Sequence, residues 1–297
     1  MESLPLVSVI CLCHNQNKYV ADAIRSVGAQ TYQNIELIVV DDGSTDDSKA
    51  TIRKLLEGTE VPFIDLSDNL GNCAAFNKGL EKSRGDFIID LAADDMLLPK
   101  RVETGINDFA NATEHAGVHF SDAFICDESG AIRTTHYPRN TDGQLTTPIP
   151  QGDIFTEVIK RYFICPPTMM MKREVFAALN GYDDTLSYED FDFWVRSARQ
   201  FHYIFNPAPL TKKRTVSGSH SNAQFAFRNQ HQKSTFRVCQ KALNLCTAED
   251  ERQALRKRIQ YEIRQCTRTL NFGLIPKYVK LMNASYRRLS SSSSMER

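Results

Sequence analysis

The sequence predicts an α/β fold built on a mainly parallel sheet flanked by helices, followed by a C-terminal helical extension. Apolar runs of strand length alternate with stretches of helical periodicity in the first part of the chain, which is typical of a parallel sheet. Beyond about residue 225 the apolar spacing is helical only. We therefore expect an α/β domain at residues 1–225, a helical extension at residues 226–289 and a disordered tail at residues 290–297.

Five strands and four helices are expected in the first half of the chain. Continuous apolar runs or β-type residues predict strands at residues 6–12, 35–40, 61–66, 86–91 and 118–124. Apolar residues three or four apart predict helices around residues 20–27, 52–56, 73–80 and 102–109. Ser44, with Asp47 three residues later, predicts the start of the second helix, and Pro99 predicts the start of the fourth.

The second half begins with a polar segment and ends in helices. Residues 133–152 are rich in Thr, Pro, Asn and Gly, which predicts a mobile surface loop of the kind that carries substrate contacts. A strand at residues 168–171, a short helix at residues 173–179 and a helix that runs to about residue 201 follow. In the extension, Thr247 with Asp250 is a capping signal, and apolar stripes mark helices at residues 255–270 and 275–289.

Charge is distributed unevenly along the chain, although Lys+Arg and Asp+Glu both number 36. Residues 248–297 carry eleven basic and five acidic residues, a net of +6, so the preceding residues carry −6. A basic end on an acidic body predicts an anionic surface or partner, whereas a solvated helix face explains the same charges. The last stripe fits either a membrane surface or packing against the main domain or a second subunit. No nucleic-acid partner is predicted.

Several classes of protein are disfavoured. No apolar stretch approaches the ~20 residues that span a bilayer, and residues 1–5 lack the basic flank of a signal peptide. The eight cysteines are scattered without paired spacing, and Cys11 and Cys13 alternate on an expected buried strand, which argues against zinc and disulfides. We expect a cytoplasmic protein that is either free or peripheral at the inner face of the membrane.

Acidic residues stand where strands end or a helix begins. Asp41-Asp42 follow the second expected strand, Asp94-Asp95 follow the fourth, and Glu189-Asp190 open the helix that contains Trp194. Ligands of open α/β sheets lie at the carboxyl ends of the strands. Carboxylates there suit a divalent cation, ribose hydroxyls and a catalytic base, a combination that indicates a nucleotide-sugar transferase.

An ordered series of motifs strengthens this interpretation. The motifs are Val7-Ser8-Val9-Ile10 with His14-Asn15, Gln30-Thr31-Tyr32, residues 38–46, Asn69-Leu70-Gly71 with Asn77-Lys78-Gly79, Gly85-Asp86-Phe87-Ile88, Asp94-Asp95 with Pro99, Gly181-Tyr182-Asp183, and residues 189–196. Together they resemble the inverting glycosyltransferases of family two over about residues 6–215. The resemblance implies a GT-A type, Rossmann-like fold, a nucleotide-diphosphate sugar donor, and Mn²⁺ or Mg²⁺.

The donor is expected to contact the first two acidic and polar motifs. Asp42 directly follows its strand, so its carboxylate can accept from the N3–H of uracil or thymine, and the resemblance places the second Asp of the pair there. Turn formation and helix capping are the alternative for Asp42, and Asp41 is interpreted as structural. The resemblance implies that His14 stacks on the base, unless it is an ordinary loop histidine, and that Asn15 and Asn77 contact the donor.

The resemblance implies that Asp95 binds the metal and Asp94 the ribose. The alternative is that both acids only complement the dipole of the helix that follows. His220 is a further candidate metal ligand or phosphate contact. The chain departs from the family pattern at Ala92, where an additional Asp is often found, and at Phe76, where an Arg often precedes the motif Asn.

Asp190 is the expected general base, with Glu189 orienting the acceptor. Inverting transfer needs one carboxylate that removes the acceptor proton as the hydroxyl attacks opposite the leaving diphosphate. The alternative is that Ser187 and Asp190 form a capping box. Trp194 on the same helix is expected in the core.

The expected activity is transfer of a hexosyl or N-acetylhexosaminyl group from a UDP- or dTDP-sugar to a hydroxyl of a glycan or lipid-linked acceptor, in polysaccharide or glycoconjugate synthesis. Sugar nucleotidyltransferases resemble one another in a Gly-rich basic loop after the first strand. Here that loop is residues 13–18, which contain no glycine, and this argues against the class. The absence of a Gly-x-Gly-x-x-Gly fingerprint disfavours a dinucleotide oxidoreductase. A degenerate family member that binds nucleotide sugar or a partner without turnover stays open, supported by Ala92 and Phe76.

Overall fold

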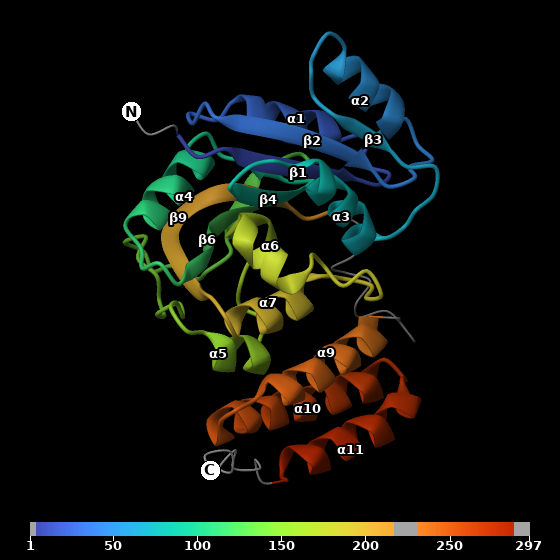
Figure 1. Ribbon diagram of the computed structural model, residues 1–297, viewed down its shortest axis with the longest axis vertical. Coiled ribbons are helices and arrows are strands. Elements are labelled where there is room, and N and C mark those ends of the chain that lie inside the picture. The colour runs from blue at the N-terminus through green and yellow to red at the C-terminus, as the bar shows by residue number, and fades with distance from the viewer. Residues whose placement is uncertain (1–3, 217–230, 288–297) are drawn as a thin grey trace, which may run out of the picture.

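The computed structural model describes residues 4–216 and 231–287, which form a nine-stranded sheet covered by helices and a C-terminal group of three helices (Figure 1). The strands are β1 (Val7–Cys13), β2 (Ile35–Asp41), β3 (Phe63–Asp65), β4 (Phe87–Ala92), β5 (Met96–Leu97), β6 (Ala116–Cys126), β7 (Ile132–Thr135), β8 (Met170–Lys172) and β9 (His202–Arg214). The predicted α/β class with a C-terminal helical extension is confirmed.

Helices flank the sheet and form the C-terminal group. They are α1 (Val20–Gly28), α2 (Ser48–Leu56), α3 (Asn72–Lys82), α4 (Arg101–Ala110), α5 (Phe155–Lys160), α6 (Arg173–Leu179), α7 (Asp190–Ala198), α9 (His231–Leu245), α10 (Glu249–Arg268) and α11 (Ile275–Ser285). Short 3₁₀ turns lie at Pro166–Thr168 and Phe272–Leu274.

The strand order is β3-β2-β1-β4-β8-β6-β9-β5, and β7 pairs with β6. β3, β2, β1 and β4 run parallel to one another, as do β6 and β9. The short strand β8 joins these two parts through antiparallel pairing with β4 and β6. Because β2, β1 and β4 are parallel neighbours, the residues that follow them lie at one edge of the sheet.

The two faces of the sheet are covered by different helices because side chains alternate along a strand. On β1, Val7, Val9 and Cys11 belong to a core cluster with residues of α1, α2 and α4. Ile10 and Leu12 belong to a second cluster with residues of α3, α6 and α7. Burial on both faces explains why these strands are continuous apolar runs.

Several helix starts and loops differ from the sequence expectation. α2 begins at Ser48 after Asp47, while the Ser44 hydroxyl donates to Asp41, so Ser44 does not cap this helix. At α10 the first-turn Glu251 accepts from the N–H groups of Thr247 and Ala248, and Ala248 is the N-cap residue in place of Thr247.

The polar segment at residues 133–152 contains more structure than expected. It begins in β7, which forms a hairpin with β6. Arg139 then donates to Asp122 at 2.7 Å, and the N–H of Gly152 donates to the carbonyl of Tyr203 at 2.7 Å. β9 was not predicted, because its middle contains Pro207 and Pro209 and its pairing with β6 shifts register there.

The C-terminal helices pack on α5 and α7 and on one another (Figure 1). Tyr278 and Leu281 of α11 are buried in the same core cluster as Val238 of α9 and Ile259 of α10. That cluster continues to Ile10 and Phe176 beside the sheet. The last apolar stripe therefore packs partly against the rest of the chain. Within residues 4–216 and 231–287, no helix is long and apolar enough to cross a bilayer.

Candidate functional site

The two acids after β2 have different surroundings. Asp41 is fully buried, and its carboxylate accepts from the N–H of Ser44 at 2.8 Å and from the Ser44 hydroxyl at 2.6 Å. Asp42 accepts from the N–H groups of Leu70 and Gly71, at 2.7 and 3.0 Å. Asp41 therefore stabilises the turn after β2, as expected. Asp42 makes no hydrogen bond within that turn. Asp42 instead ties the end of β2 to the start of α3.

His14 and Asn15 follow β1 and contact the same loop. The carbonyl of Asp42 can only accept, so His14 Nδ1, 2.7 Å away, carries the proton and donates. Nε2 then accepts from the amides of Asn15 and Asn69, at 3.2 and 3.1 Å. Asn15 has φ 54°, and its side-chain oxygen Oδ1 accepts from the N–H of Thr45 at 2.8 Å. Both side chains lie at the carboxyl edge of the sheet, beside the loop that carries Asp42.

Asp94 and Asp95 follow β4 and meet Arg214 at the end of β9. Asp95 accepts from the N–H of Arg214 at 2.8 Å, and the Arg214 guanidinium donates to the carbonyl of Asp94 at 3.2 Å and to Asp22 at 3.0 Å. β5 separates these acids from α4, whose N-cap residue is Lys100. Helix capping therefore does not explain Asp94 and Asp95.

Electrostatics at Asp95 suit a cation. Burial, and then the adjacent Asp94 carboxylate, raise the pKa of Asp95 to about 8. No group of three or more metal-ligating side chains occurs within the described part of the chain. One or two carboxylates are nevertheless the usual protein share of a Mg²⁺ site whose other ligands are phosphates and water. The Asp94-Asp95 pair fits such a site, whereas His220 lies outside the described residues.

Glu189 and Asp190 lie at the start of α7. Glu189 accepts from the Asn72 amide at 2.6 Å, at the first residue of α3. One carboxylate oxygen of Asp190 is buried and has no hydrogen-bond partner among the described residues. Burial, and then the Glu189 carboxylate, raise the pKa of Asp190 well above its ordinary value. The Ser187 hydroxyl contacts His231 and Ser234 of α9, so the capping box that was the alternative does not form.

Short links connect the predicted site residues. Asp42 accepts a hydrogen bond from the N–H of Gly71. The amide of the next residue, Asn72, donates to Glu189, which directly precedes Asp190. Asp190 and Asp95 both act electrostatically on the Cys165 thiol, whose pKa burial raises to about 12. The structure thus brings together acids that lie far apart in the sequence.

Two charged residues were missed in the sequence. Lys213 lies on β9, and its positive charge opposes the rise in the pKa values of both Asp95 and Asp190. Asp90 of β4 accepts from the Tyr182 hydroxyl at 3.2 Å, and burial followed by Glu189 raises its pKa well above the ordinary value. An acid within an apolar run is an unusual signal that could have identified Asp90. Lys213 carried no such signal, because β9 was not predicted.

Asn77 contacts Tyr182 and none of the site acids. The Asn77 amide donates to the carbonyl of Tyr182 at 2.9 Å and accepts from its N–H at 3.0 Å, so each of its polar atoms has a backbone partner. Asn77 also lines a hollow of about 720 Å³ that none of Asp42, Asp95 and Asp190 lines. Phe76 is fully buried, 4.3 Å from Tyr182 between ring centroids.

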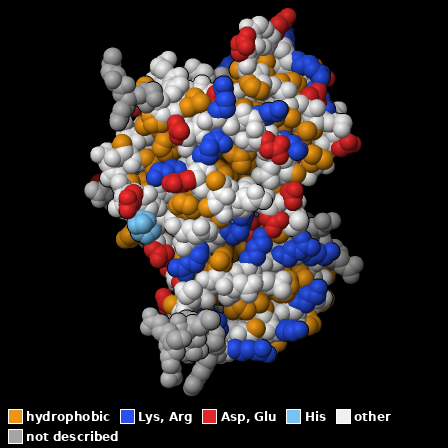
Figure 2. Space-filling view, viewed as in Figure 1, with side chains coloured by type: hydrophobic (Ala, Val, Ile, Leu, Met, Phe, Trp, Pro, Cys, Tyr) orange, Lys and Arg blue, Asp and Glu red, His pale blue; other side chains and the backbone are white. Residues whose placement is uncertain are grey.

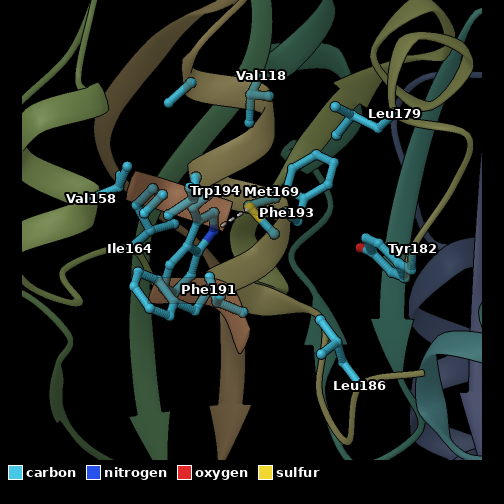
Figure 3. Close-up of a cluster of buried hydrophobic side chains, with 14 of the residues drawn as sticks. Val118, Val158, Ile164, Met169, Leu179, Tyr182, Leu186, Phe191, Phe193 and Trp194 are labelled. Carbon is cyan, nitrogen blue, oxygen red and sulfur yellow. Dashed lines mark hydrogen bonds between the residues drawn. The ribbon is translucent and has the colours of Figure 1, made fainter. Parts of the chain in front are cut away.

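Trp194 lies in the core, as expected. Figure 3 shows it among buried side chains, with its indole N–H donating to the Met169 sulfur at 3.2 Å. Phe191 and Phe193 of the same helix are also fully buried. α7 is therefore anchored by its apolar residues, while its first turn carries Asp190.

Comparison with known proteins gives consistent matches. The model of the family described as glycosyl transferase family 2 matches residues 8–179. An uncharacterized glycosyltransferase of Rickettsia bellii is 30% identical over 211 residues, covering 71% of this chain and 30% of that protein. One from Methanocaldococcus jannaschii is 29% identical over 195 residues, covering 65% of this chain and 64% of that protein. The chain thus spans less than two thirds of these relatives.

Solved structures share the fold. The chain is similar to Staphylococcus aureus TarS 1–349 in complex with UDP-GlcNAc, with TM-score 0.68, 16% identity, and coverage of 94% of this chain and 80% of that one. It is also similar to the mannosyltransferase PcManGT from Pyrobaculum calidifontis in complex with GDP-Man and Mn²⁺, with TM-score 0.61, 15% identity, and coverage of 99% and 77%. At these identities the likeness establishes the fold alone, and it confirms the GT-A type.

Proposed function

This chain belongs to glycosyl transferase family 2, and from that premise we propose that it is a metal-dependent, inverting glycosyltransferase. It transfers a hexosyl or N-acetylhexosaminyl group from a UDP- or dTDP-sugar to a hydroxyl of a glycan or lipid-linked acceptor. The process it serves is polysaccharide or glycoconjugate synthesis. The observation that carries the proposal is Asp190, whose buried oxygen lacks a hydrogen-bond partner among the described residues.

Asp190 is the base in this proposal. An acid with an elevated pKa accepts a proton more readily once ionised, and an oxygen without a partner is open to an acceptor hydroxyl. The acceptor oxygen forms the new bond to the anomeric carbon, the bond to the leaving diphosphate breaks, and Asp190 takes the hydroxyl proton. Glu189, held by Asn72, orients the acceptor beside it.

Donor binding is assigned to the edge formed by the ends of β1, β2 and β4. Asp42 uses one lone pair of each oxygen for the loop at residues 70–71, which leaves others for a uracil or thymine N3–H. His14 contacts the base and Asp94 the ribose. TarS is described with UDP-GlcNAc and PcManGT with GDP-Man, which supports a nucleotide-sugar donor and leaves the base open to test.

Asp95, together with Asp94, would hold Mn²⁺ or Mg²⁺. Such an ion supplies positive charge that stabilises a departing diphosphate. PcManGT is described with Mn²⁺, which supports this part of the proposal. Lys213 provides a second positive charge near Asp95 and Asp190, and we assign it to the donor phosphates.

The first prediction tests the base and the metal site by substitution. Asp190→Asn should lower donor turnover by about 100-fold or more, because general base catalysis contributes that much. Asp95→Ala should weaken the Mn²⁺-dependent part of UDP binding, measured by calorimetric titration with and without Mn²⁺. Asp142→Asn, an exposed acid in the polar segment, should change neither measurement. Turnover that survives both site substitutions rejects the mechanism.

Thermal stability separates a catalytic loss from misfolding. A carboxyl whose pKa is raised in the folded state stabilises the fold below its unfolded pKa and loses that contribution as pH rises through the folded pKa. Asp190→Asn should therefore raise Tm at neutral pH, by about 2 °C or more. A wild-type protein that binds UDP without turning over any UDP-, dTDP- or GDP-sugar would instead support the degenerate alternative, which Phe76 in the core favours.

We propose further that the outer surface of α10 and α11 contacts an anionic membrane surface. Figure 2 shows Lys and Arg side chains gathered over the C-terminal helices. Between residues 252 and 287, six Lys and Arg residues are exposed, and the single acid in that range, Glu262, is buried. Phe272 and Val279 are exposed beside them, at 54% and 45%. Cations around exposed apolar residues are typical of peripheral membrane contacts.

The second prediction concerns vesicle binding. The protein should sediment with vesicles of phosphatidylcholine mixed with phosphatidylglycerol and not with phosphatidylcholine alone, because each basic residue near an anionic surface contributes about 1 kcal/mol. Lys277→Glu with Lys280→Glu should abolish sedimentation, while Lys54→Glu with Lys100→Glu should not. Equal binding to both vesicle types, or a concentration-dependent dimer that these substitutions disrupt, would favour a protein partner.

A further inference from the structure

The short segment that carries the proposed base is held by the C-terminal helices. The N–H of Ser187 donates to the Ser234 hydroxyl at 3.0 Å, and the Tyr188 hydroxyl lies 2.7 Å from the Thr235 hydroxyl. Ser234 and Thr235 belong to the first turns of α9. The residues immediately before Glu189 are thus fixed by α9.

The residues immediately after Asp190 are also fixed by this extension. The Arg258 guanidinium of α10 lies 4.5 Å from the ring centroid of Phe191 and 3.9 Å from that of Tyr162. One residue further along α7, Asp192 accepts from Lys241 of α9 at 2.6 Å. Phe191 is fully buried and Asp192 nearly so, which makes these contacts part of the packed interior.

Arg258 is an unusual core residue. Its side chain is 3% exposed, and two of its nitrogens have no hydrogen-bond partner among the described residues. Its ionic partner is Glu262, 3.3 Å away on the same helix. Phe191 and Tyr162 pack edge to face, with ring centroids 5.1 Å apart, and the guanidinium lies over both of them. A guanidinium that contacts both rings of such a pair favours one arrangement of them, because its charge is attracted to the ring faces.

The two site acids face the other way. Glu189 bonds to Asn72 of α3, and Asp190 lies within the electrostatic range of Asp90 and Lys213 of the sheet. Residues on both sides of the acids therefore contact the helical extension, while the acids themselves face the site. A segment held this way has little freedom to move the carboxylate of Asp190.

We propose that Ser234, Thr235, Lys241 and Arg258, which we call the α9–α10 brace, position Asp190 for its reaction. This inference rests on the proposed role of Asp190 as the base. The brace residues are positioning residues, since they act through residues 187–192 and not on substrate. Loss of the brace lowers kcat, because a displacement of about 1 Å at a reacting group costs about 100-fold, and leaves the donor edge at Asp42 intact.

The test compares two arginines of α10 in the full-length protein. Arg258→Met removes the cation that lies over Phe191 and Tyr162. Arg256→Met is the matched control, because Arg256 is similarly buried and stacks at 4.5 Å on Tyr286, away from α7. Hydrogen–deuterium exchange of peptides covering residues 187–195 should accelerate about tenfold in Arg258→Met and not in Arg256→Met. Peptides of β1 and β2 should be unchanged in both.

Kinetics supply the second measurement. With UDP-GlcNAc and GDP-mannose as donors, Arg258→Met should lower kcat by about 10- to 100-fold with little change in donor KM. Arg258→Lys, which keeps a cation over the two rings, should recover part of kcat and cover the case in which Arg258→Met fails to fold. Unchanged exchange at residues 187–195, or equal effects of the two arginine substitutions, overturns the brace. Activity that survives Asp190→Asn overturns the proposed base and leaves the exchange result standing.

Discussion

At the scale of single residues, the site acids differ from the structural acids of the same molecule. Asp183 is a structural acid. Burial disfavours its charged form, but hydrogen bonds from Lys241 and Thr185 lower its pKa to about 2. Asp90, Asp95 and Asp190 form no ion pair among the described residues, and their pKa values are raised. Buried carboxyls without an ionic partner weaken the fold, and such groups are concentrated at functional sites, where a ligand or a proton neutralises their charge.

The third prediction uses the two charges that act on Asp190 in opposite directions. Glu189 raises its pKa and Lys213 lowers it. Since the base must be ionised, the acid limb of the kcat profile should move to lower pH in Glu189→Gln and to higher pH in Lys213→Met. The measurement is donor turnover as a function of pH. Shifts in the same direction, or none, would show that Asp190 does not set this limb.

At the scale of elements, the site depends on loops that hold one another. In the loop after β2, the carboxylate of Asp42 accepts from the N–H groups of residues 70–71. The next residue, Gly43, packs against the backbone of residues 68–69 in the loop before α3. Gly43 has φ +67°, and a Cβ there would lie 2.4 Å from the backbone carbon of Asp68. Neither the backbone angle nor the space accepts a side chain.

The fourth prediction follows from that contact. Gly43→Ala should lower the free energy of unfolding by about 2 kcal/mol or more, because strain at positive φ adds to a backbone clash. UDP binding should weaken in the same variant, since the loop that holds Asp42 must move. Gly58→Ala is the control, because Gly58 has φ +75° but nothing within 4 Å of its Cβ position. Chemical denaturation and calorimetric titration measure both, and equal losses in the two variants would contradict the argument.

The elements that could be predicted from the sequence are those whose burial produces a regular apolar pattern. β1, β2 and β4 were predicted because both faces are buried, and the acids at their ends followed from strand polarity. β9 was not, because it mixes Lys212, Lys213 and Arg214 with two prolines, and its place is set by pairing with β6. The brace around Asp190 was equally hidden, since its contacts join residues more than forty positions apart.

At the scale of the whole molecule, the extension and the α/β domain share one interior. The core cluster that includes Ile10 and Phe176 continues through Phe191 to Ile259 and Tyr278. The boundary expected near residue 225 marks a change in the apolar spacing along the sequence. It does not separate two hydrophobic cores. The buried contacts across it, including Arg258 with Phe191, link the stability of the helices to that of the site.

The last prediction is that both parts unfold together. Trp194 is the single tryptophan and lies in the core beside Met169, so its fluorescence reports the α/β domain. Circular dichroism reports all helices, and calorimetry the total heat. Tyr278→Ala, in α11, removes a fully buried ring and should cost about 3 kcal/mol. Because the interior is shared, the Trp194 transition should fall by several degrees together with the loss of helix. Tyr286→Ala, exposed at 64% on the same helical group, should leave it in place. Separate transitions, with the Trp194 transition unaffected by Tyr278→Ala, would show instead that the extension folds independently. The contacts of α9 and α10 with α7 would then not constrain that helix.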